Sequence, residues 1–173
     1  MPSSSNAGAD GPLRLGAMRL TDVDAVARIE AACFPAPWNR GHFRHELERN
    51  PYSVNRVLRR RDSVIGYSSV WILDGELQVN KVAIDPAQRG RGLGRLLMQR
   101  LLSLAAQARC HRATLEVRCG NAAARALYAS LGFVETGRRA DYYGPGEEAI
   151  LLRLDLPAAQ DAGNVVRPGA EEV

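Results

Sequence analysis

The hydrophobic pattern of the chain changes period several times and predicts an alternation of strands and helices. Apolar and polar residues alternate over 13–19, which is typical of a short strand buried on one side. Apolar residues then recur at spacings of three and four from Val23 to Cys33, and this spacing predicts a helix that Thr21 can cap. Two prolines follow closely, so we expect this helix to end at about Cys33.

The same alternation continues along the rest of the chain. Asn39 can cap a second, short helix with Phe43 and Leu47 on one face, and polar turns at 61–63 and 73–75 predict antiparallel hairpins. Further strands are expected at 52–59, 64–72, 76–84, 112–117, 133–139 and 147–156, and further helices over 93–104 and 122–131. This order predicts an α/β (α+β) fold with a mixed, mostly antiparallel sheet of about seven strands and helices on both faces.

The composition supports one globular domain between two polar tails. The chain has 173 residues, of which 46% are hydrophobic and 24% charged. We predict a domain at 13–157 and disordered tails at 1–12 and 158–173, where Ser, Ala, Gly and Pro dominate. No apolar run approaches the ~20 residues of a membrane span, and the first residues do not resemble a secretory signal. We therefore expect no membrane role and a cytoplasmic location; the oligomeric state is not fixed, with a monomer favoured.

The cysteines and histidines predict no metal site. Three cysteines cannot all pair, none forms a C-x-x-C motif, and the three histidines are not grouped with them. His42 and His45 share one face of a predicted helix, but no third ligand lies near them in the sequence. We therefore expect structural thiols and no bound metal.

The charge is positive and carried almost entirely by arginine. Between Leu13 and Pro157 there are 22 basic and 15 acidic residues, and Lys81 is the single lysine of the chain. Such a surplus attracts phosphate groups, so nucleic acid, a ribosomal surface and a phosphorylated cofactor all remain possible partners. Charge alone does not decide between them.

A glycine-rich stretch gives the sharpest local signal. Arg89-Gly90-Arg91-Gly92-Leu93-Gly94 lies between a predicted strand and a predicted helix. Glycines let a backbone approach a ligand closely, and the free N–H groups of a helix start attract anions. The dinucleotide pattern fails because Arg95 stands where its third glycine is needed, and no Gly-Lys-Ser/Thr follows for the P-loop pattern. A phosphate-binding turn and a plain glycine-rich connection both remain open at this point.

The second half of the chain favours the phosphate-binding turn. The pattern Arg89-x-x-Gly92-x-Gly94 follows Val82-Ala83-Ile84-Asp85-Pro86, and Leu115-Glu116-Val117-Arg118-x-x-Asn121 leads to Leu127-Tyr128-x-x-Leu131-Gly132-Phe133. Together these motifs resemble the GNAT superfamily of acetyl-CoA-dependent N-acetyltransferases over about 13–156. Within the superfamily the likeness is greatest to bacterial enzymes that acetylate the N-terminal alanine of a small-subunit ribosomal protein. It is supported by Phe34-Pro35-Ala36-Pro37-Trp38 and Asp141-Tyr142-Tyr143.

The resemblance implies how acetyl-CoA, the cosubstrate, is held. The strand with the apolar triplet would separate from the strand with Glu116, and the pantetheine arm would enter between them. The implied cofactor-binding residues are Val82, Ala83, Ile84, Arg89, Gly90, Arg91, Gly92, Leu93, Gly94, Arg95 and Asn121. Backbone groups of the triplet would hold the thioester, and backbone amides of the glycine turn would receive the pyrophosphate.

Two residues are candidates for the chemistry. An α-amine has a pKa near 7.7–8.0, so about a third of it is neutral around pH 7.5 and a modest base suffices. Glu116 lies between Leu115 and Val117, so strand alternation directs its carboxylate away from the face on which those two lie. Tyr128 has a hydroxyl that can donate a hydrogen bond to a leaving thiolate. The resemblance assigns the general base to Glu116 and the general acid to Tyr128.

Two positions depart from the superfamily pattern in the strand before the triplet. Gln78 stands where an acidic residue is common, which leaves Glu116 as the one obvious base. Lys81 replaces an asparagine or a small residue, and an inward ammonium would oppose a cationic substrate. We expect Lys81 to point outward.

The substrate is predicted to be a protein N-terminus, most simply that of a ribosomal protein. The aromatic residues Phe34, Trp38, Tyr142 and Tyr143 can wall a groove for an extended peptide. Four acidic residues can pair with the positive charges of a basic substrate peptide, namely Glu46, Glu48, Asp141 and Glu147. Two alternatives stay open: an enzyme of the same superfamily acting on a small amine, polyamine or lysine side chain, and a non-catalytic module that binds CoA or a ribosomal surface. No direct nucleic-acid role is expected.

Overall fold

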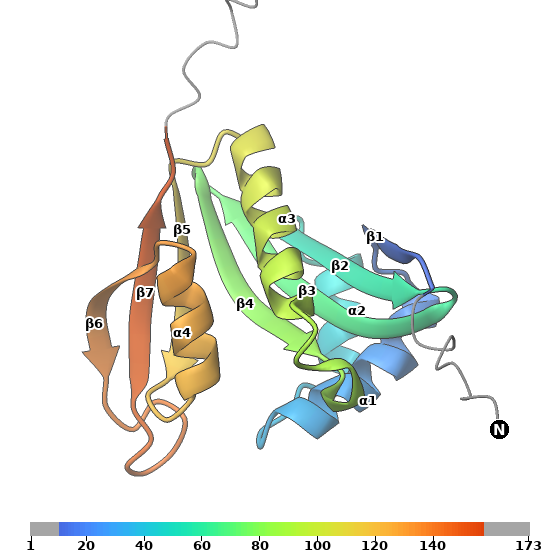
Figure 1. Cartoon of the computed structure of the whole chain (residues 1–173), viewed down its shortest axis with the longest axis horizontal. Coiled ribbons are helices and arrows are strands. Elements are labelled where there is room, and N and C mark those ends of the chain that lie inside the picture. Colours follow the sequence, from blue (N-terminus) through green and yellow to red (C-terminus); the bar gives the residue numbers. More distant parts are fainter. Residues whose placement is uncertain (1–10, 158–173) are drawn as a thin grey trace, which may run out of the picture.

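The computed structural model describes residues 11–157, which form one seven-stranded sheet with helices packed against it (Figure 1). The tails predicted at 1–12 and 158–173 fall mainly outside the described residues, and the predicted domain boundaries stay predictions. The strands are β1 (Leu13–Ala17), β2 (Ser53–Arg60), β3 (Ser63–Leu73), β4 (Glu76–Ile84), β5 (Arg112–Arg118), β6 (Val134–Arg139) and β7 (Ala149–Asp155). The helices are α1 (Val23–Cys33), α2 (Arg40–Glu48), α3 (Leu93–Gln107) and α4 (Ala122–Ser130), with 3-10 turns η1 (Leu20–Asp22) and η2 (Pro86–Gln88).

The sheet has the strand order β1-β2-β3-β4-β5-β7-β6. All neighbouring strands run antiparallel except β4 and β5, which are parallel because α3 carries the chain back across the sheet between them. The predicted hairpins β2–β3 and β3–β4 are present, and Asp74 and Gly75 adopt positive φ in the tight turn between β3 and β4. The prediction of a mixed, mostly antiparallel sheet is confirmed.

Helices cover both faces of the sheet, as predicted. On one face α1 and α2 pack through Val26, Ile29 and Phe43 onto residues such as Val57 and Tyr67. On the opposite face α3 and α4 cover the strands, with α3 over β3, β4 and β5 and α4 beside β5 and β7 (Figure 1). In residues 11–157 no helix is long and apolar enough to cross a membrane.

The start of α1 differs from the sequence prediction. Thr21 does not cap this helix, because it lies within the 3-10 turn η1. The Asp22 carboxylate instead accepts a hydrogen bond from the backbone N–H of Arg19 (2.8 Å) and pairs with the Arg59 guanidinium (2.6 Å). The first strand is accordingly two residues shorter than predicted. The cap of α2 is as predicted, since Asn39 Oδ1 accepts from the backbone N–H of His42 (3.1 Å).

Candidate active site

The sheet opens between its two parallel strands. The β4–β5 ladder joins Glu76–Val79 to Arg112–Leu115 and then stops, whereas β5 continues to pair with β7 as far as Arg118. Figure 1 shows the two strands diverging beyond this ladder. Within the described part of the chain, the second half of β4 therefore has a strand partner on its β3 side alone. An extended ligand can use such an unpaired edge as an added strand would.

A bulge in β4 lies at the point where the strands separate. Ser69 of β3 pairs with Lys81 and Val70 pairs with Val79, so Asn80 is the extra residue on β4. A bulge bends its strand and changes which face the following side chains occupy. Leu77 and Val79 pack in the core beneath α3, but Lys81, two residues further, contacts α1 on the other face.

Glu116 lies on β5 just beyond the last paired residue. Its neighbours Leu115 and Val117 are buried in the core under α3 and α4, so its carboxylate is on the opposite face, as the alternation predicts. The Arg139 guanidinium is 2.7 Å from Glu116 Oε1, and the two side chains are 54% and 27% exposed. A hydrogen bond from the Tyr142 hydroxyl to the Glu116 carboxylate raises the pKa of that tyrosine.

Tyr128 approaches from the other face of the sheet. It lies on α4 and packs against the core under α3 and α4, with its ring 5.9 Å from that of Phe133 in an edge-to-face contact. Burial raises the pKa of Tyr128 to about 12, so its hydroxyl keeps its proton at neutral pH.

Tyr143 is half-buried next to Tyr142, with its ring 5.0 Å from that of Tyr142. Its pKa is raised to about 12, mainly by burial and then by the Glu116 carboxylate, and the neighbouring Tyr142 and Tyr128 add to this effect. The Arg118 guanidinium lies 4.3 Å from the Tyr143 ring centre. The structure therefore brings these two predicted substrate residues together beside Glu116.

The loop that carries the two tyrosines is fixed by its own polar contacts. Asp141 has a φ of 53°, and its carboxylate accepts from the backbone N–H of Gly146 (2.6 Å).

Glu147 pairs with Arg118, and Glu46 on α2 is buried and accepts from the Trp71 indole. Of the four acids proposed for a basic substrate, three are thus engaged within the protein, and Glu48 is exposed.

The glycine turn forms the start of α3. Gly90 and Gly92 have φ values of 75° and 72°, Gly92 is the N-cap, and no side chain of the described residues caps this end. The first helical amide to bond back is that of Leu96, to the Gly92 carbonyl (3.0 Å). A Cβ atom on either glycine would meet nothing within 4 Å, so the space beside this turn is open. This end of the helix can bind an anion.

Three predicted cofactor residues also have partners within the protein. Arg89 donates to Cys33 Sγ (3.0 Å) and to the Ile84 carbonyl (3.3 Å), which ties α1 to the end of β4. Arg95 donates to Ser130 Oγ (2.6 Å), and Asn121 Oδ1 caps α4 through the backbone N–H of Ala124 (3.1 Å). Arg91 is exposed.

Lys81 does not point outward, contrary to the sequence prediction. Its Nζ atom is 2.9 Å from Glu30 Oε1, and its side chain is only 15% exposed. The ammonium lies 4.2 Å from the ring centre of Phe34 and 5.3 Å from that of Trp38. The physical reason is the bulge at Asn80, which turns Lys81 toward the buried carboxylate on α1.

Glu30 is a site residue that the sequence analysis missed. Its side chain is fully buried, and it accepts hydrogen bonds from the Trp38 backbone N–H (2.9 Å) and from the Tyr67 hydroxyl. The sequence contains a sign that Glu30 is buried, because Glu30 lies four residues after Val26 and so falls on the apolar face of α1. An acid on an apolar helix face indicates a buried polar partner.

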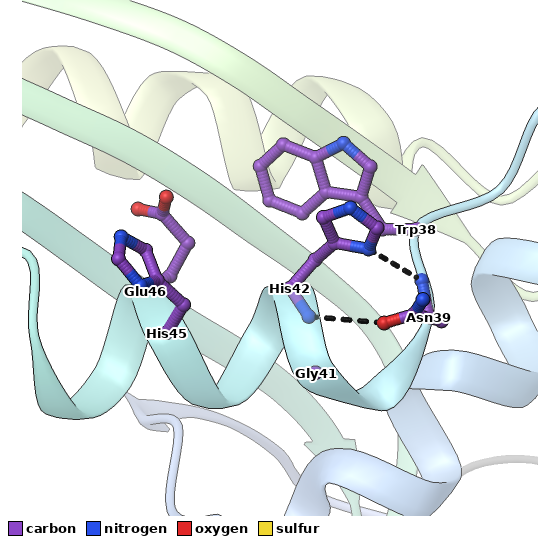
Figure 2. A pocket seen from close by; sticks show the side chains of 6 residues that line it. All are labelled: Trp38, Asn39, Gly41, His42, His45 and Glu46. Atoms are coloured by element: carbon purple, nitrogen blue, oxygen red, sulfur yellow. Dashed lines mark hydrogen bonds between the residues drawn. The ribbon is translucent and has the colours of Figure 1, made fainter.

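Trp38 also separates this cluster from a pocket along α2. The pocket has a volume of 290 Å³ and is lined by Trp38, Asn39, Gly41, His42, His45 and Glu46. Figure 2 shows the His42 imidazole beside the Trp38 indole, with 6.1 Å between their ring centres. His42 Nδ1 accepts from the backbone N–H of Asn39 (3.1 Å), so it is used in the helix cap. No group of three metal-ligating side chains occurs in residues 11–157.

Comparisons with known proteins agree with this architecture. Residues 23–133 match the acetyltransferase (GNAT) family. A putative ribosomal protein bS18-alanine N-acetyltransferase of Bacillus subtilis is 38% identical over 140 residues, which are 80% of this chain and 93% of the relative. The N-alpha-acetyltransferase RimI of Mycobacterium tuberculosis is 36% identical over 151 residues, 83% of this chain and 93% of the relative. The crystal structure of the ribosomal-protein-S18-alanine N-acetyltransferase of Escherichia coli superposes with a TM-score of 0.79 at 28% identity, over 87% of this chain and 98% of that one.

Proposed function

The chain belongs to the acetyltransferase (GNAT) family, and from this membership we propose that it transfers the acetyl group of acetyl-CoA to the N-terminal α-amine of a protein. The relatives named for the alanine of ribosomal protein bS18 make a ribosomal protein that begins with alanine the first candidate acceptor. Acetylation of such a protein would occur in the cytoplasm, where ribosomes are assembled.

The observation that supports the proposal is the position of Glu116 on β5, just beyond the last residue paired with β4, together with Tyr128 packed on the other face of the same strand region. Glu116 lies on the face opposite the α3–α4 core, and Tyr128 packs on the α4 side. A thioester between the two strands would have a carboxylate on one side and a phenol on the other. This is the arrangement that direct attack by an amine requires, because the proton is lost on one side of the reacting carbon and the leaving group departs on the other.

Each group has a defined task in this proposal. Glu116 accepts the proton that the attacking nitrogen loses, directly or through one water, as the new C–N bond forms. Tyr128 donates a hydrogen bond to the sulfur as the C–S bond breaks. Its raised pKa suits this task, because a buried phenol stays protonated over the working pH range and can stabilise a thiolate without giving up its proton completely.

The remaining predicted cofactor residues fit the two ends of acetyl-CoA. The free amides at the start of α3 suit the pyrophosphate, and Gly90 and Gly92, whose positive φ favours glycine, place no side chain in this turn. The unpaired edge of β4 at Val82–Ile84 offers backbone groups to the pantetheine amides and to the thioester oxygen. Arg89 and Asn121 would act here mainly by fixing the backbone, because their side chains already have partners.

The acceptor would lie on the face of the sheet that Glu116 shares with α1 and α2. Phe34 and Trp38 form one wall with Lys81, and Tyr142 and Tyr143 form the other wall with Arg139. An α-amine is favoured over a lysine because about a third of it is neutral at pH 7.5, against about one part in a thousand for a lysine side chain. Arg139 already balances the negative charge of Glu116, so the site also favours an acceptor whose amine is uncharged when it binds.

The test is the acetylation of a panel of acceptors by the purified protein. Peptides that begin Ala-Arg, Met or Ser are compared with free polyamines and with a lysine peptide whose N-terminus is blocked. The proposal expects turnover of the N-terminal peptides, with alanine first. Preferred acetylation of polyamine or of the blocked lysine peptide would support the alternative enzyme function. Binding of acetyl-CoA without turnover of any acceptor would support a non-catalytic module.

Two variants separate the catalytic roles. Glu116→Gln should lower kcat about 10²–10⁴-fold with little change in acetyl-CoA affinity. Tyr128→Phe should also lower kcat, but its defect should shrink with an acyl donor whose leaving thiol is more acidic, since that sulfur needs less stabilisation. Glu135→Gln and Tyr52→Phe are matched controls outside the opening. Equal rescue of both site variants by the activated donor would contradict the assigned roles.

A further inference from the structure

Lys81 lies in a cage made of one carboxylate and two aromatic rings. We call Glu30, Phe34 and Trp38 the Glu30 cage: the Lys81 ammonium is 2.9 Å from the carboxylate and 4.2 Å and 5.3 Å from the two ring centres. A carboxylate combined with aromatic faces is the chemistry by which proteins bind alkylammonium ions. In this chain the cage is filled by a cation of the protein itself.

Glu30 forms its ion pair with this lysine. Its oxygens also accept from the Trp38 backbone N–H and the Tyr67 hydroxyl, and both of those donors are neutral. Among the described residues Lys81 is the cation paired with Glu30. A fully buried carboxylate that loses its cation is strongly destabilised, so an emptied cage should attract another cation.

The cage also faces the opening between the two parallel strands. The last paired residues are Val79 and Leu115, and Asn80 is the bulged residue. Lys81 therefore lies two residues beyond the last paired residue of β4, on the face of the sheet that Glu116 shares. A charge at Lys81 acts on whatever side chain the acceptor presents next to its reacting amine.

We propose that Lys81 fills the Glu30 cage in place of an external cation and thereby disfavours acceptors that carry a second positive charge beside the reacting amine. Polyamines and peptides whose first residue is lysine belong to that disfavoured class. A first residue with a small, uncharged side chain brings no second charge. This inference rests on the proposed function, because it places the acceptor at the wall formed by the cage.

The first test measures whether an external cation can replace Lys81, and it needs no catalysis. Lys81→Ala should unfold about 10 °C below the parent protein. Propylammonium chloride should recover at least a third of that loss, compared with sodium chloride at the same ionic strength. The double variant Glu30→Gln/Lys81→Ala lacks the negative charge and should not respond to propylammonium. No recovery in Lys81→Ala, or equal recovery in the double variant, would overturn the proposal.

A second variant covers the case in which Lys81→Ala does not fold. Lys81→Met fills more of the space and removes the same charge, so it serves in the same comparison. If neither variant folds even when it is refolded with propylammonium, no external cation can enter the cage, and the proposal is wrong.

The second test measures specificity with two acceptors of similar shape. Matched peptides begin with lysine or with norleucine, which differ chiefly in the terminal ammonium. The ratio of their kcat/KM values, lysine over norleucine, should rise about 10-fold in Lys81→Ala. It should not change in Arg112→Ala, which breaks an ion pair with Glu76 at the paired end of the strands. An unchanged ratio in Lys81→Ala would overturn the proposal. Failure of the parent protein to acetylate any N-terminal peptide would refute the proposed function, while the propylammonium test would still decide whether Lys81 fills the cage.

Discussion

Tyr67→Phe removes one buried hydroxyl that contacts the Glu30 cage. Tyr67 and Glu30 are both fully buried, and the hydroxyl of the tyrosine donates to the carboxylate. Burial and the Glu30 charge raise the pKa of Tyr67, so the hydroxyl is a donor at every working pH. The phenylalanine would keep the edge-to-face contact with Phe43, whose ring centre is 5.5 Å away. The change therefore leaves one carboxylate oxygen without its donor and little else.

The size of the effect follows from that single loss. Leaving a buried, charged acceptor without its donor costs about 2–3 kcal/mol. Urea unfolding should show this decrease in the free energy of unfolding, and Tm should fall by about 5–10 °C. In a double-mutant cycle with Glu30→Gln the coupling energy should be at least about 1 kcal/mol. Tyr52→Phe, at a position that is 48% exposed, is the control and should be neutral. A Tyr67→Phe variant as stable as its parent, or a strictly additive cycle, would refute the reasoning.

The same variant should affect acceptor binding and leave cofactor binding unchanged. Glu30 fixes the Trp38 backbone and Lys81, so its loosening should raise the KM for a peptide acceptor. α3 lies on the face of the sheet opposite to α1 and Glu30, so the Kd of acetyl-CoA should stay the same. Titration calorimetry with acetyl-CoA checks whether the Kd of the cofactor is unchanged in Tyr67→Phe.

Further predictions concern the phenol and the glycine turn. Because burial raises the pKa of Tyr128 to about 12, the pH–rate profile should show no decline from this group near pH 10; a decline that disappears in Tyr128→Phe would contradict this. The same raised pKa contributes stability that is fully present below pH 10 and is lost as the pH rises through about 12, so Tyr128→Phe should show a smaller alkaline loss of stability in a urea series. Gly92→Ala should lower the free energy of unfolding by about 1–2 kcal/mol, because Gly92 has a φ of 72°. Gly94→Ala should leave urea unfolding nearly unchanged, since its Cβ would meet only Leu127 Cδ2 at 3.5 Å.

Most of the fold could be predicted from periodicity and turn residues. Strand alternation, helical spacing and the Asn39 cap gave the elements and their order, with ends that differ by at most three residues. The predicted cap of α1 was wrong because Thr21 lies within the 3-10 turn that precedes the helix. The contacts of that turn include an ion pair between the Asp22 carboxylate and Arg59, which is distant in the chain.

The candidate site was only partly predictable, for a related reason. The positions of Glu116 and Tyr128 follow from strand alternation and the helix that carries the tyrosine. The orientation of Lys81 does not, because one bulged residue, Asn80, reverses the faces of the positions that follow it. Glu30 was missed because helical spacing marks it as buried but does not indicate its partners, which come from β3 and β4.

One peptide that carries two different amines can show which amine the protein acetylates. The peptide begins with a free alanine and contains a single lysine, and fragmentation mass spectrometry locates the acetyl group after reaction with acetyl-CoA. We expect acetyl on the α-amine of the alanine, with the lysine unmodified, and loss of nearly all product in Glu116→Gln. Acetyl on the lysine, a mixture of both sites at similar rates, or undiminished product in Glu116→Gln would contradict this expectation.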